Sequence, residues 1–215
     1  MKNLTEHEAK KMLKKAGIPI TKEFLTKTPE EAVKYAKKIG FPVVLKISSP
    51  DILHKTDVGG ILVGLENEKE VKKGFEKIIK NVKKRKPKAK IQGILVQEMV
   101  SGKELIIGSK KDIQFGPVIM FGLGGIFVEV LKDVSFRVIP IKKEDAREMI
   151  KEIKGYPILK GIRGEKPIKF KALIDCLLKV SDFVWKNKKI QELDINPLFA
   201  NENGVKAADV KIILN

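Results

Sequence analysis

The chain has 215 residues, 43% of them hydrophobic, and its 44 Lys and Arg against 27 Asp and Glu give a formal net charge of +17. This hydrophobic fraction argues against disorder, and no apolar run approaches the roughly 20 residues that span a bilayer. The N-terminal residues 1–15 lack the apolar core of a signal peptide, and a single cysteine, Cys176, excludes a disulfide framework. We therefore expect a soluble, cytoplasmic protein.

The positive charge has three interpretations: solvated helix faces, as in the Lys-rich proteins of hyperthermophiles, an anionic ligand such as a nucleotide, or nucleic acid. The main basic run, residues 72–90, lies on a predicted helix and its end. Aromatic residues make up only 6%, so the stacking partners of nucleic-acid sites are scarce. Composition favours solvated helix faces, then an anionic ligand, and it hints at a thermophilic source.

The first half of the chain alternates helices and strands. Three segments open with helix-capping residues and are predicted as helices, starting at Thr5, Thr28 and Asn67. Apolar runs bounded by turn residues predict strands at 42–47, 61–65 and 91–100. We expect residues 21–100 to form one compact unit of helices and strands.

After residue 101 the pattern becomes richer in strands. Strands are predicted at 103–109, 118–123 and 134–141, helices at 144–153 and 168–185, and a final hairpin at 191–200 and 205–214. Neither a repeat nor a low-complexity linker separates the two parts, so we predict packed subdomains with the ligand between them. The smaller one is 21–100, and the larger one is 1–20 plus 101–215.

The predicted C-terminal hairpin brings two oxygen-bearing side chains together. If 201–204 is a four-residue loop, Asn196 lies directly opposite Asp209; a two-residue loop keeps both on one face, and a three-residue loop separates them. Asp194 lies on the same face as Asn196. Mg²⁺ takes one or two protein oxygens and completes its shell with phosphates and water. Asn196 and Asp209 are therefore candidate Mg²⁺ ligands, and the alternative is two ordinary polar strand ends.

Three charged residues stand at strand positions that suit a nucleotide. Lys46 lies near the end of an apolar strand, where an uncompensated ammonium is costly to bury. It therefore either meets an anion or lies on an exposed edge. Glu98 and Glu104 flank the passage from one predicted unit to the next, where carboxylates could bond purine edges and ribose hydroxyls. Glutamates at strand ends are also common in ordinary sheets.

The glycine cluster at 122–125 matches neither of the standard phosphate-binding loops. We expect it to permit a sharp turn that leads toward Glu129 and Asp133. Arg137, farther along, is a candidate phosphate contact.

His54 is one of only two histidines in the chain. Close behind it, Asp57 can orient an imidazole, Lys55 can neutralise a phosphate, and the glycine pair 59–60 can grant mobility. Metal ligation lacks partner side chains, and no Gly-x-Ser-x-Gly motif supports a serine triad. The remaining roles for His54 are general acid–base catalysis and nucleophilic attack by the imidazole.

Four segments together resemble the β subunit of ADP-forming acyl-CoA synthetases: VVLKISSPDILHKTDVGGI (43–61), ILVQEMVSGKELIIG (94–108), FGLGGIFVEVLKDVSFRVIP (121–140) and ELDINPLFANENGVKAADVKIIL (192–214). The similarity extends from about Thr5 to the C-terminus. The order of elements is also similar to the ATP-grasp region of the succinyl-CoA synthetase β subunit. The resemblance implies an α+β, ATP-grasp fold, an α/β sandwich of two subdomains with the nucleotide between them.

The resemblance also implies residue roles. The phosphates of ATP or ADP would meet Lys46, the adenine would meet Glu98 and the backbone of Val100, the ribose would meet Glu104, and Mg²⁺ would be held by Asn196 and Asp209. His54 matches the histidine that takes a phosphoryl group on a mobile loop and passes it to or from the nucleotide. The interval between Glu98 and Glu104 is tighter than in succinate-type enzymes. The glycine-rich loop of those enzymes is missing as well, which favours the acetate-type branch.

The activity implied is that of a ligase subunit that converts acyl-CoA, ADP and phosphate reversibly to acid, ATP and CoA. The CoA-binding and acyl-activating parts of the family are absent from these 215 residues. We therefore expect a separate α subunit with CoA-binding and phosphohistidine domains, in an α2β2 assembly. Two alternatives stay open: a regulatory module that binds ATP without transferring a phosphoryl group, and a basic nucleic-acid-binding domain.

Overall fold

The computed structural model describes residues 1–52, 54–125, 133–162 and 164–215. The chain divides into two compact units: a larger unit of Met1–Ile20 with Val100–Asn215, and a smaller unit of Thr21–Met99. Within the described residues, no helix is long and apolar enough to cross a membrane.

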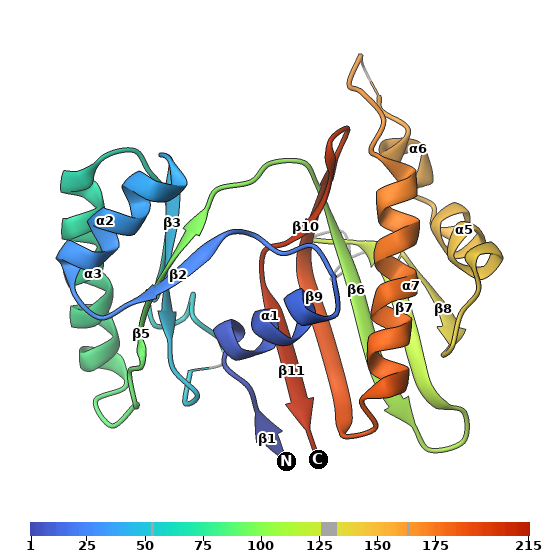
Figure 1. Cartoon of the computed structure of the whole chain (residues 1–215), viewed down its shortest axis with the longest axis horizontal. Helices are drawn as coiled ribbons and strands as arrows, with labels where there is room; N and C mark the ends of the chain where they lie inside the picture. Colours follow the sequence, from blue (N-terminus) through green and yellow to red (C-terminus); the bar gives the residue numbers. More distant parts are fainter. Residues whose placement is uncertain (53, 126–132, 163) are drawn as a thin grey trace. The chain divides into compact units, whose positions relative to one another are not determined.

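The smaller unit is a four-stranded antiparallel sheet with two helices on one face (Figure 1). Its strands, in spatial order, are β2 (Glu23–Thr26), β5 (Gly93–Glu98), β3 (Val43–Ser48) and β4 (Ile61–Leu65). The helices are α2 (Pro29–Ile39) and α3 (Glu68–Arg85). The sequence predicted all of these elements except β2, because four residues are too few to show a periodic pattern.

Alternation along β3 separates the core of the smaller unit from its other sheet face. Val43, Leu45 and Ile47 join the apolar cluster under α2 and α3. Since successive side chains of a strand point to opposite faces, Lys46 lies on the face away from these helices. It is nevertheless only 6% exposed.

The larger unit is a seven-stranded antiparallel sheet with helices packed against it (Figure 1). The order is β1-β11-β9-β6-β7-β8, and β10 extends the pairing of β9. The strands are β1 (Lys2–Asn3), β6 (Lys103–Asp112), β7 (Gly116–Leu123), β8 (Val134–Val138), β9 (Ile190–Asn201), β10 (Gly204–Ala207) and β11 (Val210–Leu214). The helices are α1 (Glu6–Lys15), α5 (Lys143–Glu152), α6 (Tyr156–Leu159) and α7 (Phe170–Lys186).

One face of the larger sheet is apolar and covered by helices, whereas the other carries charged residues beside apolar ones such as Met120 and Phe136. Leu105 and Ile107 of β6 and Leu193 and Ile195 of β9 are buried in the same cluster as the inner residues of α1, α5 and α7. The alternate residues form what we call the polar face, which carries Lys110 on β6, Glu192 and Asp194 on β9, and Lys211 on β11. Glu104 and Asn196 alternate onto this face, whereas Arg137 pairs with the buried Ile119 and lies on the helix-covered face.

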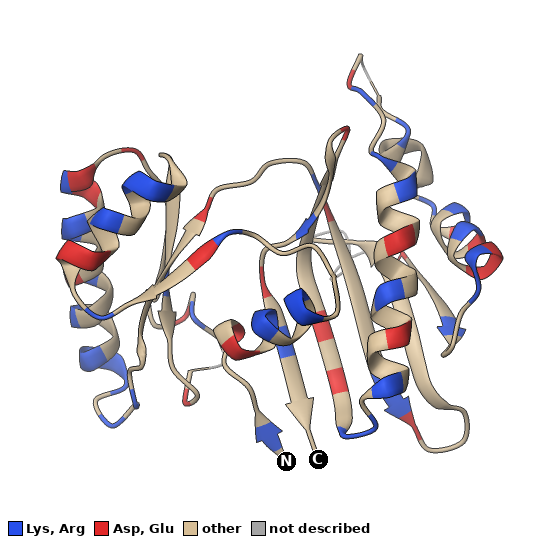
Figure 2. Ribbon diagram, in the orientation of Figure 1, with Lys and Arg blue, Asp and Glu red and all other residues tan. Residues whose placement is uncertain are grey.

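The helix starts follow the predicted capping chemistry. The Thr5 hydroxyl accepts from the Glu8 amide at 3.4 Å, while the Thr5 amide donates to the Glu8 carboxylate at 2.8 Å. Thr28 and Asn67 cap α2 and α3 in the same way. Figure 2 shows that many of the lysines and arginines lie along the helices, as the solvated-face interpretation predicts. Lys83, Lys84 and Lys86, at the end of α3, are all exposed.

Candidate functional site

The C-terminal hairpin places Asn196 beside Asp209. Ala200 pairs with Val205, which is the predicted register. Asn201 also pairs with Gly204, so the loop is shorter than the four residues assumed and consists of Glu202 and Asn203. The backbone N–H of Asn196 donates to the backbone carbonyl of Asp209 at 3.1 Å. The predicted second strand, 205–214, is in fact two strands, β10 and β11, and the break between them contains Asp209.

A β-bulge in β9 determines how Asn196 is presented. Leu105 of β6 pairs with Leu198, and Ile107 pairs with Ile195, so β9 has one more residue than β6 over the same interval. The extra residue falls at Asn196 and Pro197, where proline has no N–H for the ladder. Bulges re-aim side chains beside functional sites, and the Asn196 side chain is exposed. The bulge was not predicted, and the proline within a strand was the available signal.

The donor atoms at this position suit magnesium. They are one carboxylate and one amide oxygen, with the carboxylate of Asp194 nearby. Among the residues that the structure describes, no group of three or more His, Cys, Asp and Glu forms a complete protein cage for a metal. Mg²⁺ keeps much of its shell for waters and phosphates and is held by one or two protein oxygens. The residues present therefore fit Mg²⁺ that is bound together with a phosphate ligand.

The half-buried Asp194 has a raised pKa. It pairs across the sheet with Gly108 on one side and Lys211 on the other. Burial raises the pKa of Asp194 to about 6; Lys211 opposes this rise, and Glu192 and Asp209 add to it. Lys211 also bonds Glu192 at 2.9 Å. The polar face therefore holds a carboxyl that a nearby cation would ionise fully.

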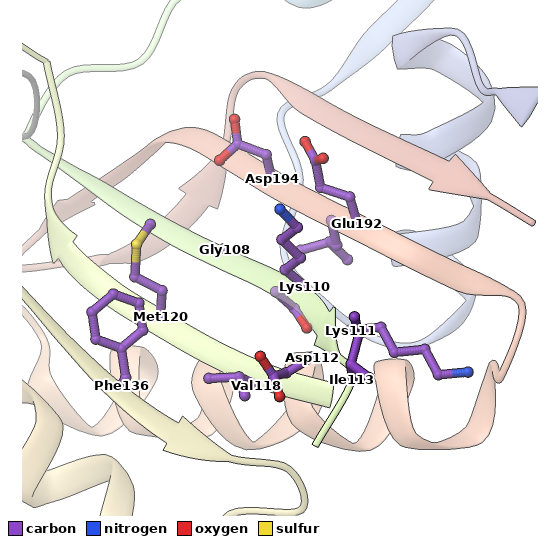
Figure 3. A pocket seen from close by; sticks show the side chains of 12 residues that line it. Gly108, Lys110, Lys111, Asp112, Ile113, Val118, Met120, Phe136, Glu192 and Asp194 are labelled. Atoms are coloured by element: carbon purple, nitrogen blue, oxygen red, sulfur yellow. The ribbon is translucent and has the colours of Figure 1, made fainter. Parts of the chain in front are cut away.

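A cavity of about 670 Å³ opens on the polar face next to Asp194 (Figure 3). Met120 and Phe136 stand on one side of it and Glu192 and Asp194 on the other, with Gly108 between them. A Cβ on Gly108 would lie 3.1 Å from Cε of Met120, so the glycine lets the methionine lie close against β6 between the apolar and the acidic side. Sequence reasoning missed this cavity, because it is assembled from four strands that are adjacent only in the folded sheet.

Glu104 lies against the glycine cluster. The Gly124 amide donates to the Glu104 carbonyl at 2.7 Å, and a Cβ on Gly125 would lie 2.9 Å from the Glu104 carboxylate. Gly125 has a φ of 62°, the left-handed conformation that favours glycine. Gly122 and Leu123 still belong to β7, and the course of the expected turn beyond Gly125 lies outside the described residues. Glu129, the next expected residue, lies outside the described residues.

Asp133 and Arg137 have structural partners. The buried Asp133 carboxylate accepts from the backbone amides of Lys154 and Gly155, both at 2.7 Å. Arg137 donates to Glu152 of α5 at 2.9 Å. This bond is the main reason why the pKa of Arg137 is raised and that of Glu152 lowered. A phosphate contact by Arg137 would therefore compete with an ion pair that ties β8 to α5.

The expected nucleotide contacts are divided between the two units. Lys46 and Glu98 belong to the smaller unit, whereas Val100 belongs to the larger one. The Glu98 carboxylate accepts from the Lys22 amide at 2.7 Å, so one of its oxygens already has a backbone donor. Val100 borders a hollow of about 290 Å³ that Phe199 also lines.

His54 is exposed on the loop between β3 and β4. Asp57 is exposed as well, and its backbone carbonyl accepts from Arg85 at 2.6 Å. A Cβ on Gly60 would lie 2.5 Å from Cγ2 of Ile47, far inside van der Waals contact. Gly60 therefore permits close packing, which differs from the mobility expected of the glycine pair.

Comparison with known proteins identifies the family. The model of the ATP-grasp domain family matches residues 1–214. The β subunit of ADP-forming acetate–CoA ligase I from Pyrococcus furiosus is 50% identical over 212 residues, which are 98% of this chain and 91% of that protein. ADP-forming 4-hydroxybutyrate–CoA ligase from Nitrosopumilus maritimus is 51% identical over 98% of this chain, but only 30% of that protein is matched.

A solved structure agrees with this fold over the whole length of this chain. It is the dinucleotide-forming acetyl-coenzyme A synthetase 1 of Ca. Korarchaeum cryptofilum, in complex with coenzyme A, Ca-AMPCP and HgCl⁺. The identity is 51% and the TM-score 0.97, with 100% of this chain and 94% of that chain covered. The resemblance inferred from the four sequence segments is thereby confirmed. This chain belongs to the ATP-grasp family, in the group that contains the β subunits of ADP-forming acetate–CoA ligases.

Proposed function

We propose that this chain is the nucleotide-binding β subunit of an ADP-forming acyl-CoA ligase. The assembled enzyme converts acyl-CoA, ADP and phosphate reversibly to acid, ATP and CoA. The observation that carries the proposal is the pairing of Asn196 with Asp209 at a bulge, on the face that also holds Asp194. The names of the relatives and the Ca-AMPCP bound to the Korarchaeum protein support it.

Asn196 and Asp209 hold Mg²⁺ in this proposal, and the bound metal neutralises phosphate charge. Lys46 meets the phosphates from β3. Lys46 is only 6% exposed and lies on the sheet face away from α2 and α3. Phosphoryl transfer depends on such positioning and charge neutralisation.

The nucleoside contacts follow the family pattern. Glu98 and the backbone of Val100 contact the adenine, and Glu104 contacts the ribose. Glu104 is exposed whereas Glu98 is half-buried, and the missing side chain at Gly125 makes room for the Glu104 carboxylate itself. Arg137 is left out of the proposed site, because Glu152 occupies its guanidinium.

His54 carries the phosphoryl group in the proposed relay. A neutral imidazole nitrogen attacks the phosphorus of a phosphohistidine on the partner, an N–P bond forms on His54, and the partner's N–P bond breaks. A terminal oxygen of ADP then attacks the same phosphorus, which yields ATP and frees the imidazole. The exposed position of His54 supports this role, since both donor and acceptor need access.

The partner in this proposal is an α subunit with CoA-binding and phosphohistidine domains, in an α2β2 assembly. The Nitrosopumilus relative supports it, because the region that matches this chain is 30% of a single longer ligase. When the β part is a separate chain, the remaining parts of the enzyme are supplied by another chain. The β-subunit name of the Pyrococcus protein implies such a division for that enzyme.

Incubation with γ-labelled ATP and Mg²⁺, with and without the α subunit, tests the proposal. We expect acid-labile, alkali-stable label on the wild-type chain, its removal by ADP, and no label on a His54→Asn variant. ATP binding without any label would contradict the relay and support a regulatory module. Full turnover by the His54→Asn enzyme would mean that the partner's carrier transfers directly to the nucleotide.

A further inference from the structure

Two side chains of α3 brace the loop that carries His54. The Asn81 amide group donates to the Gly59 carbonyl at 3.2 Å, and the Arg85 guanidinium donates to the Asp57 carbonyl at 2.6 Å. Residues four apart lie on the same face of a helix, so Asn81 and Arg85 form one row along α3. Both bonds end on backbone carbonyls within five residues of His54.

The end of the loop is fixed on β3. The Gly60 amide donates to the Lys55 carbonyl at 2.7 Å, which closes the chain segment from Lys55 to Gly60 just after His54. The Ile47 amide then donates to the Gly60 carbonyl at 2.7 Å. Ile47 follows Lys46 directly, so the strand that presents the candidate phosphate ligand also anchors this end of the loop.

The start of the loop is held as well. The Asp51 amide donates to the Ser49 hydroxyl at 3.2 Å, and the Asp51 carboxylate accepts from the Lys90 amide at 2.7 Å. Ile52 and Val58 are buried in the core of the smaller unit. The exposed His54 therefore stands between two buried anchor residues, in a loop whose backbone is bonded on both sides.

We infer that Asn81 and Arg85 are positioning residues for His54, and this inference rests on the proposed function of that histidine. They contact no part of the imidazole and act through the loop backbone, which they hold against α3. The imidazole is thus presented from a fixed support, so the phosphoryl donor and the nucleotide have to approach it. Such positioning raises the rate of a transfer without forming any bond to the reacting groups.

A set of matched variants separates this role from charge and from general stability. Asn81→Ala and Arg85→Met each remove one brace, whereas Arg85→Lys keeps the charge and one donor. Lys84→Met is the control, because it removes an exposed positive charge next to Arg85.

Two readouts apply to every variant. The first is the rate of tryptic cleavage after Lys55, measured on the whole chain by mass spectrometry. The second is the initial rate of His54 labelling by γ-labelled ATP and Mg²⁺ in the reconstituted complex with its α subunit, together with kcat and the KM for ADP.

We expect cleavage after Lys55 to accelerate in the Asn81→Ala and Arg85→Met variants. We expect the labelling rate and kcat to fall by roughly ten- to a hundredfold, because a small misplacement of a reacting group is enough for such losses. The KM for ADP should stay unchanged, Arg85→Lys should restore most of the rate, and Lys84→Met should match the wild type.

Wild-type rates of labelling in the Asn81→Ala, Arg85→Met double variant would overturn the inference. So would an unchanged cleavage rate after Lys55 in that variant. If the wild-type complex itself acquires no label on His54, the proposed relay fails, and the cleavage rates alone decide whether Asn81 and Arg85 hold the loop. A loss of rate in Arg85→Lys equal to that in Arg85→Met also contradicts a positioning role.

Discussion

At the scale of single residues, Asp194 is the most informative group on the polar face. Its neighbours include one cation, Lys211, and two further acids, Glu192 and Asp209. Burial and the acids together keep its pKa near 6, above the ordinary 3.8. A Mg²⁺ ion bound nearby would lower the pKa of Asp194 again, because a nearby positive charge favours the ionised carboxyl.

We predict that Asp194→Asn stabilises the metal-free chain at pH 8. A pKa of about 6 in the folded chain and 3.8 in the unfolded one destabilises the fold by at most about 3 kcal/mol at neutral pH. The folded state binds the extra proton, so this cost appears as the pH rises from about 4 to 6 and is complete above 6. Denaturant unfolding should therefore show a higher free energy of unfolding for Asp194→Asn than for the wild type at pH 8, and no difference at pH 4.

The control for this prediction is Asp175→Asn, because Asp175 is an exposed carboxyl on α7. It should leave the free energy of unfolding nearly unchanged at both values of pH. An Asp194→Asn chain that is less stable than the wild type at pH 8 would show that Lys211 outweighs burial.

Two basic residues illustrate what sequence could and could not resolve. Lys46 and Arg137 both stand in predicted strands, and both were candidate phosphate contacts. The structure buries Lys46 but joins Arg137 to Glu152. Strand periodicity determines the face on which each residue lies, whereas the partner of Arg137 comes from a helix that follows β8 in the chain. Only the packing of α5 on β8 distinguishes the two.

At the scale of elements, the bulge in β9 is what turns two polar strand residues into a candidate metal site. We predict that Asp209→Asn and Asn196→Ala each weaken the binding of Mg·ATP at least tenfold, about 1.4 kcal/mol. Calorimetric titration with Mg·ATP, and with ATP in the presence of EDTA, checks this. The metal-free binding should change little, because these side chains act through the metal.

Glu192→Gln provides the control on the same face. Glu192 bonds Lys211 and has no assigned metal contact, so its substitution should affect Mg·ATP binding far less than Asp209→Asn does. Equal losses in both variants would mean that the general acidity of the polar face matters and that no specific ligand pair exists.

The junction of β3 with the His54 loop yields a prediction about packing. A Cβ at residue 60 would lie 2.5 Å from Cγ2 of Ile47, so Gly60→Ala should destabilise the chain by about 1–3 kcal/mol through overpacking. Ile47→Ala removes the clashing atom. The double variant should therefore lose less stability than the sum of the two single variants. Additive losses in denaturant unfolding would contradict the clash.

The predicted elements show where sequence patterns are sufficient. Thr5, Thr28 and Asn67 each begin a helix as predicted, because capping is a contact between near neighbours. The predicted strand at 205–214 is interrupted at Asp209, which no local signal marks. The interruption lies opposite the bulge at Asn196. It depends on the pairing of β9 with β11 on one side and with β6 on the other.

At the scale of the whole molecule, the described residues form one apolar cluster in each unit. One lies in the larger unit and includes Leu193, and the other lies in the smaller unit and includes Ile78. A domain with its own core can open independently of its neighbour. The free energy of local opening should therefore respond to a cavity in the same unit only.

We predict that Ile78→Ala, which costs about 2–5 kcal/mol as a fully buried truncation, accelerates hydrogen exchange in β3 and β5. The amides of β6 and β9 should exchange at their wild-type rates. Leu193→Ala should accelerate exchange in β6 and β9 and leave the amides of β3 and β5 at their wild-type rates. Native-state hydrogen exchange resolved by mass spectrometry measures both, and equal acceleration in the two units would show that they unfold together.

By itself, the sequence determined the features that depend on near neighbours and on alternation: the helix starts, most of the strands, and the face on which Lys46, Asp194 and Asn196 lie. Its four segments also identified the ATP-grasp family. Only the tertiary structure decided the proton affinity of Asp194, the partner of Arg137 and the support of the His54 loop by α3. Each of these depends on burial or on contacts between residues far apart in the chain, and such contacts exist only after the strands have paired and the helices have packed.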